Sequence, residues 1–287
     1  MAIRIVRDVV FAAPQVGYGG GNGTLVPYPL KLDAYLPERA GPVPALVLAF
    51  GGAFHRGTKE SDAFSDGVGT STAMADYCRH FAERGLACFS LQYRLAQTDP
   101  APVTDPVLQR PEAVSLARAS VVRQMLGLGP ITVPDMARAM EAAYEDVATG
   151  ARYVLAHADE LGVDPRRVVI GGFSAGGRAA VYAAYARHVP VAGVVSISGP
   201  MAPEDAAHWA RRGDKLPPLL AVTGEKDLDH VVKATPPMLD ALASAGVVAE
   251  WCKVPAATHF YPASSVAADG RTVLETITAA LKRWGCL

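Results

Sequence analysis

The most informative stretch of this chain is residues 167–184, which read RVVIGGFSAGGRAAVYAA. An apolar run leads into the pentapeptide Gly172-Phe173-Ser174-Ala175-Gly176, and an alanine-rich helical run follows it directly. A strand, a tight turn and a helix form the setting in which a G-x-S-x-G sequence presents a serine hydroxyl above a sheet. Small residues on both sides of the serine let two backbone segments approach each other around a strained turn. Ser174 is therefore predicted to be a nucleophile, with an ordinary glycine and serine turn as the alternative.

The bulk properties favour one compact domain. The chain has 287 residues, and no linker or internal repeat divides it, so we expect a single domain over residues 1–287. Half of the residues are hydrophobic and the formal net charge is −1, which gives no electrostatic reason to expect nucleic acid or a membrane surface as a partner. A small molecule is the expected partner, and assembly into a homo-oligomer stays open.

The cysteines and the N-terminus bear on the cellular compartment. Cys78, Cys88, Cys252 and Cys286 are scattered, without a C-x-x-C pair or a metal-binding spacing, so we expect reduced thiols, no metal site and no cofactor. The first residues lack the long apolar core of a signal peptide, and no apolar run is long enough to span a bilayer. The cytoplasm is the expected location.

Short apolar runs alternate with helical patterns along the chain. The apolar runs that are nearly continuous, as in strands covered on both faces, are residues 45–50, 86–91, 168–170, 191–197, 219–222 and 247–254. Residues 30–35 alternate instead, which predicts a half-buried strand near a sheet edge. Helices are expected over about 72–84, 134–161 and 235–245, with a last one ending at 284. This alternation predicts an α/β fold with a parallel sheet and helices on both faces.

Two segments interrupt the alternation. Residues 96–133 are rich in proline and polar side chains, with a short helical pattern around 111–126. Residues 199–217 contain three prolines and Trp209. Each segment follows the carboxyl end of a predicted strand, which is where α/β sheets bind ligands. We interpret both as cap-like insertions that wall a pocket, with plain surface loops as the alternative.

A serine nucleophile needs a base to take its proton and an acid to orient that base. In elbow-type enzymes the chain order is serine, acid, histidine. His259 lies in a loop between an apolar strand and the last predicted helix, where a base can lie over the sheet, so it is preferred to His208 and His230.

The acid is expected in the loop after the apolar run at 219–222. Asp227 is our choice in that loop, and Glu225 and Asp229 are the alternatives. Three charged residues in one turn are otherwise typical of a solvated loop.

Hydrogen-bond donors for an oxyanion are expected from two places. Ala175 follows the nucleophile, and Gly52 and Ala53 lie in a glycine-containing loop after the run at 45–50, so the N–H groups of these three residues are the predicted donors. A tight glycine turn without a ligand is the alternative. The candidate substrate contacts are Gly51, Phe54, His55, Phe173 and Trp209. Arg110, Arg118 and Arg123 are interpreted as a solvated helix face, with contact to a substrate carboxylate as the alternative.

These stretches, in this order, resemble α/β-hydrolase-fold carboxylesterases of the hormone-sensitive-lipase-like and related acyl-esterase branches. Phe50-Gly51-Gly52-Ala53-Phe54 stands where the family has a His-Gly-Gly-Gly-aromatic oxyanion loop, and Gln92-Tyr93-Arg94-Leu95 resembles its Asp-Tyr-Arg-Leu segment. Asp164-Pro165-Arg166-Arg167-Val168 resembles the family's approach to the serine turn. The resemblance covers roughly residues 30–285 and implies a three-layer α/β-hydrolase fold with a mostly parallel sheet of about eight strands.

The resemblance implies a serine hydrolase that cleaves a carboxylic ester through an acyl-enzyme, with Ser174, Asp227 and His259 as the catalytic triad and without cofactor or metal. An amidase or arylformamidase of the same fold is the alternative, and a non-catalytic ligand-binding protein on this scaffold is another. Three residues depart from the family. Phe50 replaces the usual histidine that braces the oxyanion loop, and Phe173 fills a position that is often polar. Ala53 replaces the third glycine, so its backbone must keep a negative φ or accept strain.

Overall fold

The computed structural model describes residues 1–19, 24–60, 63–210 and 216–287. Within these ranges the strands are β1 (Ile3–Ala12), β2 (Gln15–Val16), β3 (Val26–Pro27), β4 (Leu30–Pro37), β5 (Val43–Ala49), β6 (Ala87–Leu91), β7 (Val163–Phe173), β8 (Gly193–Ile197), β9 (Leu219–Gly224) and β10 (Ala249–Val254). The helices are α1 (Met74–Ala82), α2 (Ala117–Met125), α3 (Val133–Ala156), α4 (Ala158–Leu161), α5 (Ala175–Tyr185), α6 (Pro203–Ala210), α7 (Asp229–Ser244) and α8 (Val273–Arg283). Short 3-10 turns lie at Ala96–Thr98 and Pro111–Ala113.

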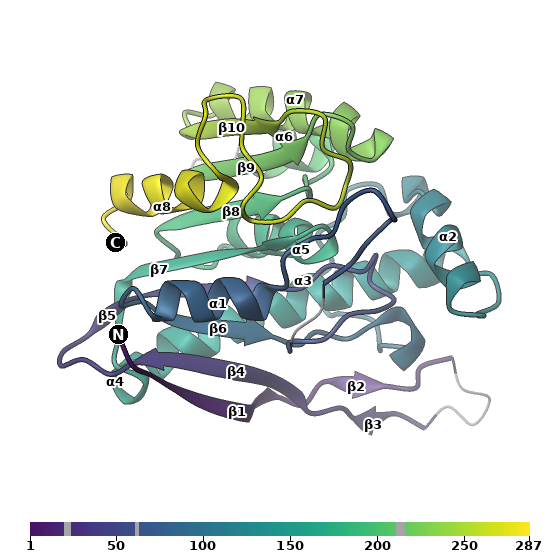
Figure 1. Ribbon diagram of the computed structural model, residues 1–287. Coiled ribbons are helices and arrows are strands. Elements are labelled where there is room, and N and C mark those ends of the chain that lie inside the picture. The colour runs from purple at the N-terminus through teal and green to yellow at the C-terminus, as the bar shows by residue number, and fades with distance from the viewer. Residues whose placement is uncertain (20–23, 61–62, 211–215) are drawn as a thin grey trace.

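A sheet of eight strands runs through the described part of the molecule, with helices in front of it and behind it (Figure 1). The strand order is β1-β4-β6-β5-β7-β8-β9-β10. All neighbouring pairs from β6 to β10 are parallel, whereas β4 pairs antiparallel with both β6 and β1. The predicted α/β class with a mostly parallel sheet of about eight strands is confirmed.

The connections between strands place a crevice at the centre of this sheet. After β5 the chain passes through α1 to β6 on one side, and after β7 it passes through α5 to β8 on the other side. Because parallel crossovers are right-handed, α1 and α5 cover opposite faces. The carboxyl ends of β5 and β7 therefore lie where the direction of winding reverses, which is where open α/β sheets bind ligands.

The middle strands are buried along most of their length, which explains their continuous apolar runs. Val47, Ile170 and Val194 are aligned on three neighbouring strands, and each has 0% exposure. This packed row of β-branched side chains holds the carboxyl ends of β5, β7 and β8 in a fixed relation to one another.

The sheet edge differs from the prediction. The run at 30–35 lies next to the edge strand, as expected, but β4 is mostly buried rather than half-buried, because α1 packs on it and β1, which the sequence analysis did not predict, pairs outside it. The polar residue of the alternation, Asp33, is fully buried and pairs with Lys59 at 2.7 Å and with Arg7. Ion pairing therefore allows a charged residue to lie inside the strand.

The helices also differ from the prediction in detail. The long helix expected over 134–161 ends at Ala156, and α4 follows it after His157. Helix α7 begins at Asp229, so Pro236 and Pro237 lie inside it, although Thr235-Pro236 was expected to be its start. Interior prolines cost helix stability, and the buried side chains of this helix offset that cost. Segment 199–217 contains α6, which was not predicted, and its residues 211–215 lie outside the described ranges.

No helix in the described ranges has the length and apolar character that crossing a membrane requires.

Candidate active site

Ser174 lies in the sharp turn between β7 and α5, with φ 53° and ψ −116°. Such a conformation is strained for a residue with a side chain, and strain of this kind is often found at functional sites. The turn depends on missing side chains, because a Cβ on Gly176 would lie 2.1 Å from the carbonyl oxygen of Ala49. A Cβ on Gly172 would lie 2.4 Å from the same atom. The start of α5 thus packs directly on the end of β5.

Ser174, His259 and Asp227 form a hydrogen-bonded row, which we call the Ser–His–Asp row. His259 Nε2 lies 2.9 Å from Ser174 Oγ, and His259 Nδ1 lies 2.6 Å from Asp227 Oδ1. An ionised Asp227 accepts the proton on Nδ1, which assigns the neutral tautomer with a free lone pair on Nε2. In this tautomer His259 can accept the proton of the Ser174 hydroxyl.

The carboxylate of Asp227 is held on both oxygens. Oδ1 also accepts from the Leu228 N–H at 2.7 Å, and Oδ2 accepts from the Gly224 N–H at 3.1 Å and from Ser198 Oγ at 2.6 Å. Ser198 was missed in the sequence analysis. Its position directly after β8, at the carboxyl edge of the sheet, is the signal that could have found it.

The alternative acids and bases lie outside the row. Glu225 accepts from the Ala256 N–H at 2.7 Å, and Asp229 is exposed with Lys233 Nζ at 3.2 Å. His208 packs edge-on against Trp209. His230 lines the pocket described below, where desolvation, followed by the charge of Arg178, lowers its pKa to about 4.

The loop after β5 takes an unusual backbone path. Gly52, Ala53 and Phe54 have φ of 112°, 55° and 63° in succession. Ala53, which stands at the position of the family's third glycine, therefore accepts the strain that the sequence analysis gave as one of two outcomes, at a cost of roughly 1–2 kcal/mol. The Ala53 carbonyl lies 2.7 Å from His55 Nδ1, and the Gly52 carbonyl accepts the His55 N–H at 3.0 Å, so the strained turn is held by hydrogen bonds.

Phe50 and Tyr93 brace this loop where the family uses a histidine. Their rings stack with centroids 4.4 Å apart and an interplanar angle of 19°. The Tyr93 hydroxyl donates to the Phe50 carbonyl at 2.9 Å. Ring stacking and the buried hydrogen bonds of Tyr93 to the Phe50 and Gly51 carbonyls thus fix the start of the loop without an imidazole.

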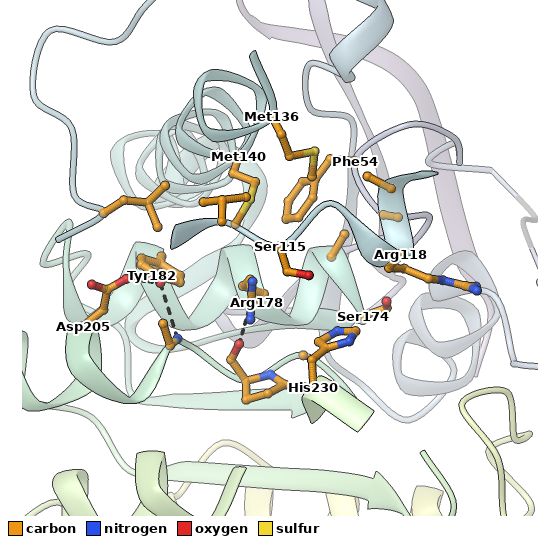
Figure 2. A pocket seen from close by; sticks show the side chains of 18 of the residues that line it. Phe54, Ser115, Arg118, Met136, Met140, Ser174, Arg178, Tyr182, Asp205 and His230 are labelled. Carbon is orange, nitrogen blue, oxygen red and sulfur yellow. Dashed lines mark hydrogen bonds between the residues drawn. The ribbon is translucent and has the colours of Figure 1, made fainter. Parts of the chain in front are cut away.

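A cavity of about 210 Å³ opens beside Ser174 (Figure 2). We call it the Ser174 pocket. Ala53 and Ala175, two of the predicted oxyanion donors, line it, whereas Gly52 does not. Ala175 is the first residue of α5, so its N–H has no partner inside the helix. The remaining wall comes from both insertions, through residues 108–119 and 199–205, and from helices α3 and α5.

Of the five predicted substrate contacts, Phe54 lines the Ser174 pocket and the other four do not. The Phe173 ring packs against His259 with centroids 5.1 Å apart, and it fills the space beside Gly51, whose Cβ would lie 2.6 Å from that ring. His55 is fully buried and binds its own loop, and burial lowers its pKa. Trp209 joins the two insertions, because its Nε1 donates to the Val107 carbonyl at 3.1 Å.

Of the three arginines of the first insertion, two line the Ser174 pocket and one does not. Arg110 and Arg118 line the pocket, and Arg110 pairs with the exposed Glu112 at 3.3 Å. Arg123 does not line it and donates to the Gly129 carbonyl. Arg178 on α5 also lines the pocket and was not singled out in the sequence analysis.

Comparison with known proteins supports the fold. The BD-FAE family model matches residues 135–196, which include Ser174. The chain is similar to esterase 2 of the planctomycete Thermogutta terrifontis in its native form, with 19% identity, a TM-score of 0.63, and coverage of 96% of this chain and 94% of that chain. The propionate-bound form gives 19% identity, a TM-score of 0.62 and 96% coverage of both chains. The form phosphoramylated by tabun gives 19% identity, a TM-score of 0.63 and 96% coverage of both. No curated protein matches the chain in sequence.

The chain therefore has the α/β-hydrolase fold, as the sequence resemblance predicted.

Proposed function

We propose that this protein is a serine hydrolase that cleaves carboxylic esters. Ser174 attacks the ester carbonyl while His259 takes its proton, and Asp227 orients the imidazole and stabilises its cationic form. The N–H groups of Ala53 and Ala175 bind the oxyanion, with Gly52 as a further donor. His259 then protonates the leaving alcohol and activates the water that releases the acid from Ser174.

The observation that carries the proposal is the Ser–His–Asp row at the mouth of a pocket. Its two hydrogen bonds, at 2.9 and 2.6 Å, meet the distance that proton transfer needs. Ala53 and Ala175, two of the predicted oxyanion donors, line the same cavity as Ser174.

The similar proteins support the choice of an ester. Thermogutta terrifontis esterase 2 has been solved with propionate bound, with butyrate bound, and after phosphorylation by paraoxon. A cavity of about 210 Å³ beside Ser174 suits acyl groups of that size.

The test combines turnover with covalent labelling. Ser174→Ala should abolish hydrolysis of p-nitrophenyl butyrate and labelling by a fluorophosphonate probe, whereas Ser244→Ala, an exposed serine of α7, should keep both. Full turnover in Ser174→Ala would overturn the proposal. Faster cleavage of aryl formamides than of short acyl esters by the wild type would replace the esterase by an amidase.

We also propose that the protein acts in the cytoplasm. All four cysteines are buried free thiols, which suits a reducing compartment. Fractionation of the cells that produce the protein tests this, and recovery outside the cytoplasm would overturn it.

A further inference from the structure

One face of α5 forms the floor of the Ser174 pocket. Ser174, Arg178 and Tyr182 are four residues apart, and all three line the pocket. Figure 2 shows Arg178 between the end of the pocket at Ser174 and the end at Tyr182. Four residues of a helix rise about 6 Å, so the arginine projects about one turn beyond the nucleophile.

Arg178 brings a charge that is not neutralised by an ion pair among the described residues. Its Nε donates to the Pro200 carbonyl at 2.8 Å, which orients the guanidinium. Asp205 lines the same pocket and forms no ion pair with Arg178; its two oxygens accept from the Gln109 N–H at 3.0 Å and from the Tyr182 hydroxyl. The charge of Arg178 acts on Asp205 and on the Tyr144 hydroxyl, but no ion pair among the described residues engages its amino groups.

Arg118 adds a second cation at the other side of Ser174. Its guanidinium lies 5.8 Å from the centroid of the Phe260 ring, and no ion pair of Arg118 is found within the described ranges. Burial, followed by the charge of Arg56, lowers its pKa, so an anionic ligand would relieve an unfavourable environment.

The opposite wall is apolar. Phe54, Met136 and Met140 face the cavity from the oxyanion loop and from α3 (Figure 2). A ligand that fits both walls combines a short apolar spacer with one anionic end. Because Glu204 and Asp205 also line the pocket, a singly charged carboxylate suits it better than a doubly charged phosphate.

We propose that the substrate of this enzyme is an ester that also carries a carboxylate, which binds Arg178 about one helical turn from the scissile carbonyl. The inference rests on the proposed esterase function and adds the class of substrate. Arg178 is then a residue that determines specificity.

The test compares charged and neutral esters of the same shape. Monoethyl glutarate and ethyl 5-oxohexanoate place the carboxylate or a neutral ketone on the acyl side, and 4-acetoxybutyrate and 5-acetoxy-2-pentanone place them on the alcohol side. Acid release is followed by titration at about pH 7.5, where the carboxylates are ionised. The wild type should prefer the anionic member of at least one pair by roughly tenfold or more in kcat/KM.

Variants then assign the preference to Arg178. Arg178→Gln should lower kcat/KM for the preferred anionic ester by roughly 10- to 100-fold, mainly through KM, and change its neutral partner by less than about threefold. Arg178→Lys, which keeps the charge but loses the planar fork, should fall between. Glu204→Gln should favour the anionic ester further. Arg4→Gln, the same charge change at an exposed position of β1, is the control and should leave both esters unchanged.

The outcomes separate the two proposals. Equal kcat/KM for both members of each pair, or equal losses on both members in Arg178→Gln, would overturn the carboxylate site and leave the esterase in place. The absence of turnover of all four esters would also overturn it. Failure to hydrolyse p-nitrophenyl butyrate is the separate result that removes the esterase itself.

Discussion

The Ser–His–Asp row and the wall of the Ser174 pocket lie side by side but are held by different parts of the chain. The residues of the row follow β7, β9 and β10 within five positions of the strand ends. The wall comes largely from the two insertions, where Arg110, Ser115 and Glu204 are exposed. The row is therefore positioned by the buried sheet, and the wall by segments at the surface.

The Ser–His–Asp row and the pocket wall also differ in the hydrogen bonds that hold them. Besides the Ser198 hydroxyl, Asp227 accepts from backbone N–H groups close to it in sequence, at Gly224 and Leu228. The wall is joined across distant parts of the chain, through Asp205 to the Gln109 N–H and through Trp209 to the Val107 carbonyl. We therefore expect substitutions to alter the structure of the wall more easily than that of the row.

The largest effect is expected in the row itself. Asp227→Asn should lower kcat by about 10⁴-fold, because an amide N–H cannot accept the proton on Nδ1 and favours the wrong tautomer of His259. Steady-state kinetics on p-nitrophenyl butyrate measure it. Asp229→Asn is the control, since this exposed acid pairs only with Lys233 among its described neighbours, and a larger loss there would contradict the assignment of the acid.

Glycine substitutions compare the backbones of the two regions. Gly176→Ala should lower the free energy of unfolding by about 3 kcal/mol, because the new Cβ would lie 2.1 Å from the Ala49 carbonyl oxygen. Gly129→Ala, in the first insertion, meets nothing within 4 Å and should stay within about 0.5 kcal/mol of the wild type. Urea denaturation measures both, and similar values would remove the contrast between the rigid sheet edge and the tolerant first insertion.

A smaller loss of activity is expected when the hydrogen bond from Ser198 to Asp227 is removed. Ser198→Ala removes the 2.6 Å hydrogen bond to Asp227 Oδ2 and should lower kcat about tenfold. Ser196→Ala, on the adjoining strand β8, removes a bond to the Gly199 carbonyl instead and should change kcat less than about threefold. If both variants lose activity equally, Ser198 acts through packing rather than through the carboxylate.

The smallest effect is expected in the wall. Trp209→Phe loses the bond to the Val107 carbonyl and should lower the free energy of unfolding by about 1 kcal/mol. KM should rise by about threefold with kcat unchanged, because only the wall shifts. Trp251→Phe also loses an indole hydrogen bond, to Thr223 Oγ1 at 2.9 Å, but on β10, so its KM should not change. A change in kcat for Trp209→Phe would show that wall and row are coupled.

The same contrast explains what could be predicted from sequence. The central strands were predictable because burial on both faces demands continuous apolar runs, and the positions of Ser174, Asp227 and His259 followed from their places after such runs. The outer strand β1 was not predicted, and helix α7 begins before its prolines because tertiary packing outweighs local propensity.

The lining of the pocket could not be predicted because it depends on the direction of single side chains. His55 and Trp209 lie in the right segments, but each points to a backbone carbonyl instead of the cavity. Arg178 faces the cavity because it lies one turn after Ser174, and its sequence context is only that of a helical run. The four-residue spacing from Ser174 is the sequence feature from which the position of Arg178 could have been predicted.

The links between Gln109 and Asp205 and between Val107 and Trp209 join positions that are 96 and 102 residues apart in the chain. The two insertions are therefore expected to evolve together. A relative that shortens or redirects one of them must also alter the other, or leave buried polar groups without partners. Shifts of substrate range in this lineage should accordingly appear as paired changes at 107–109 and 205–209, and an engineered graft of either insertion alone should fail where a graft of both succeeds.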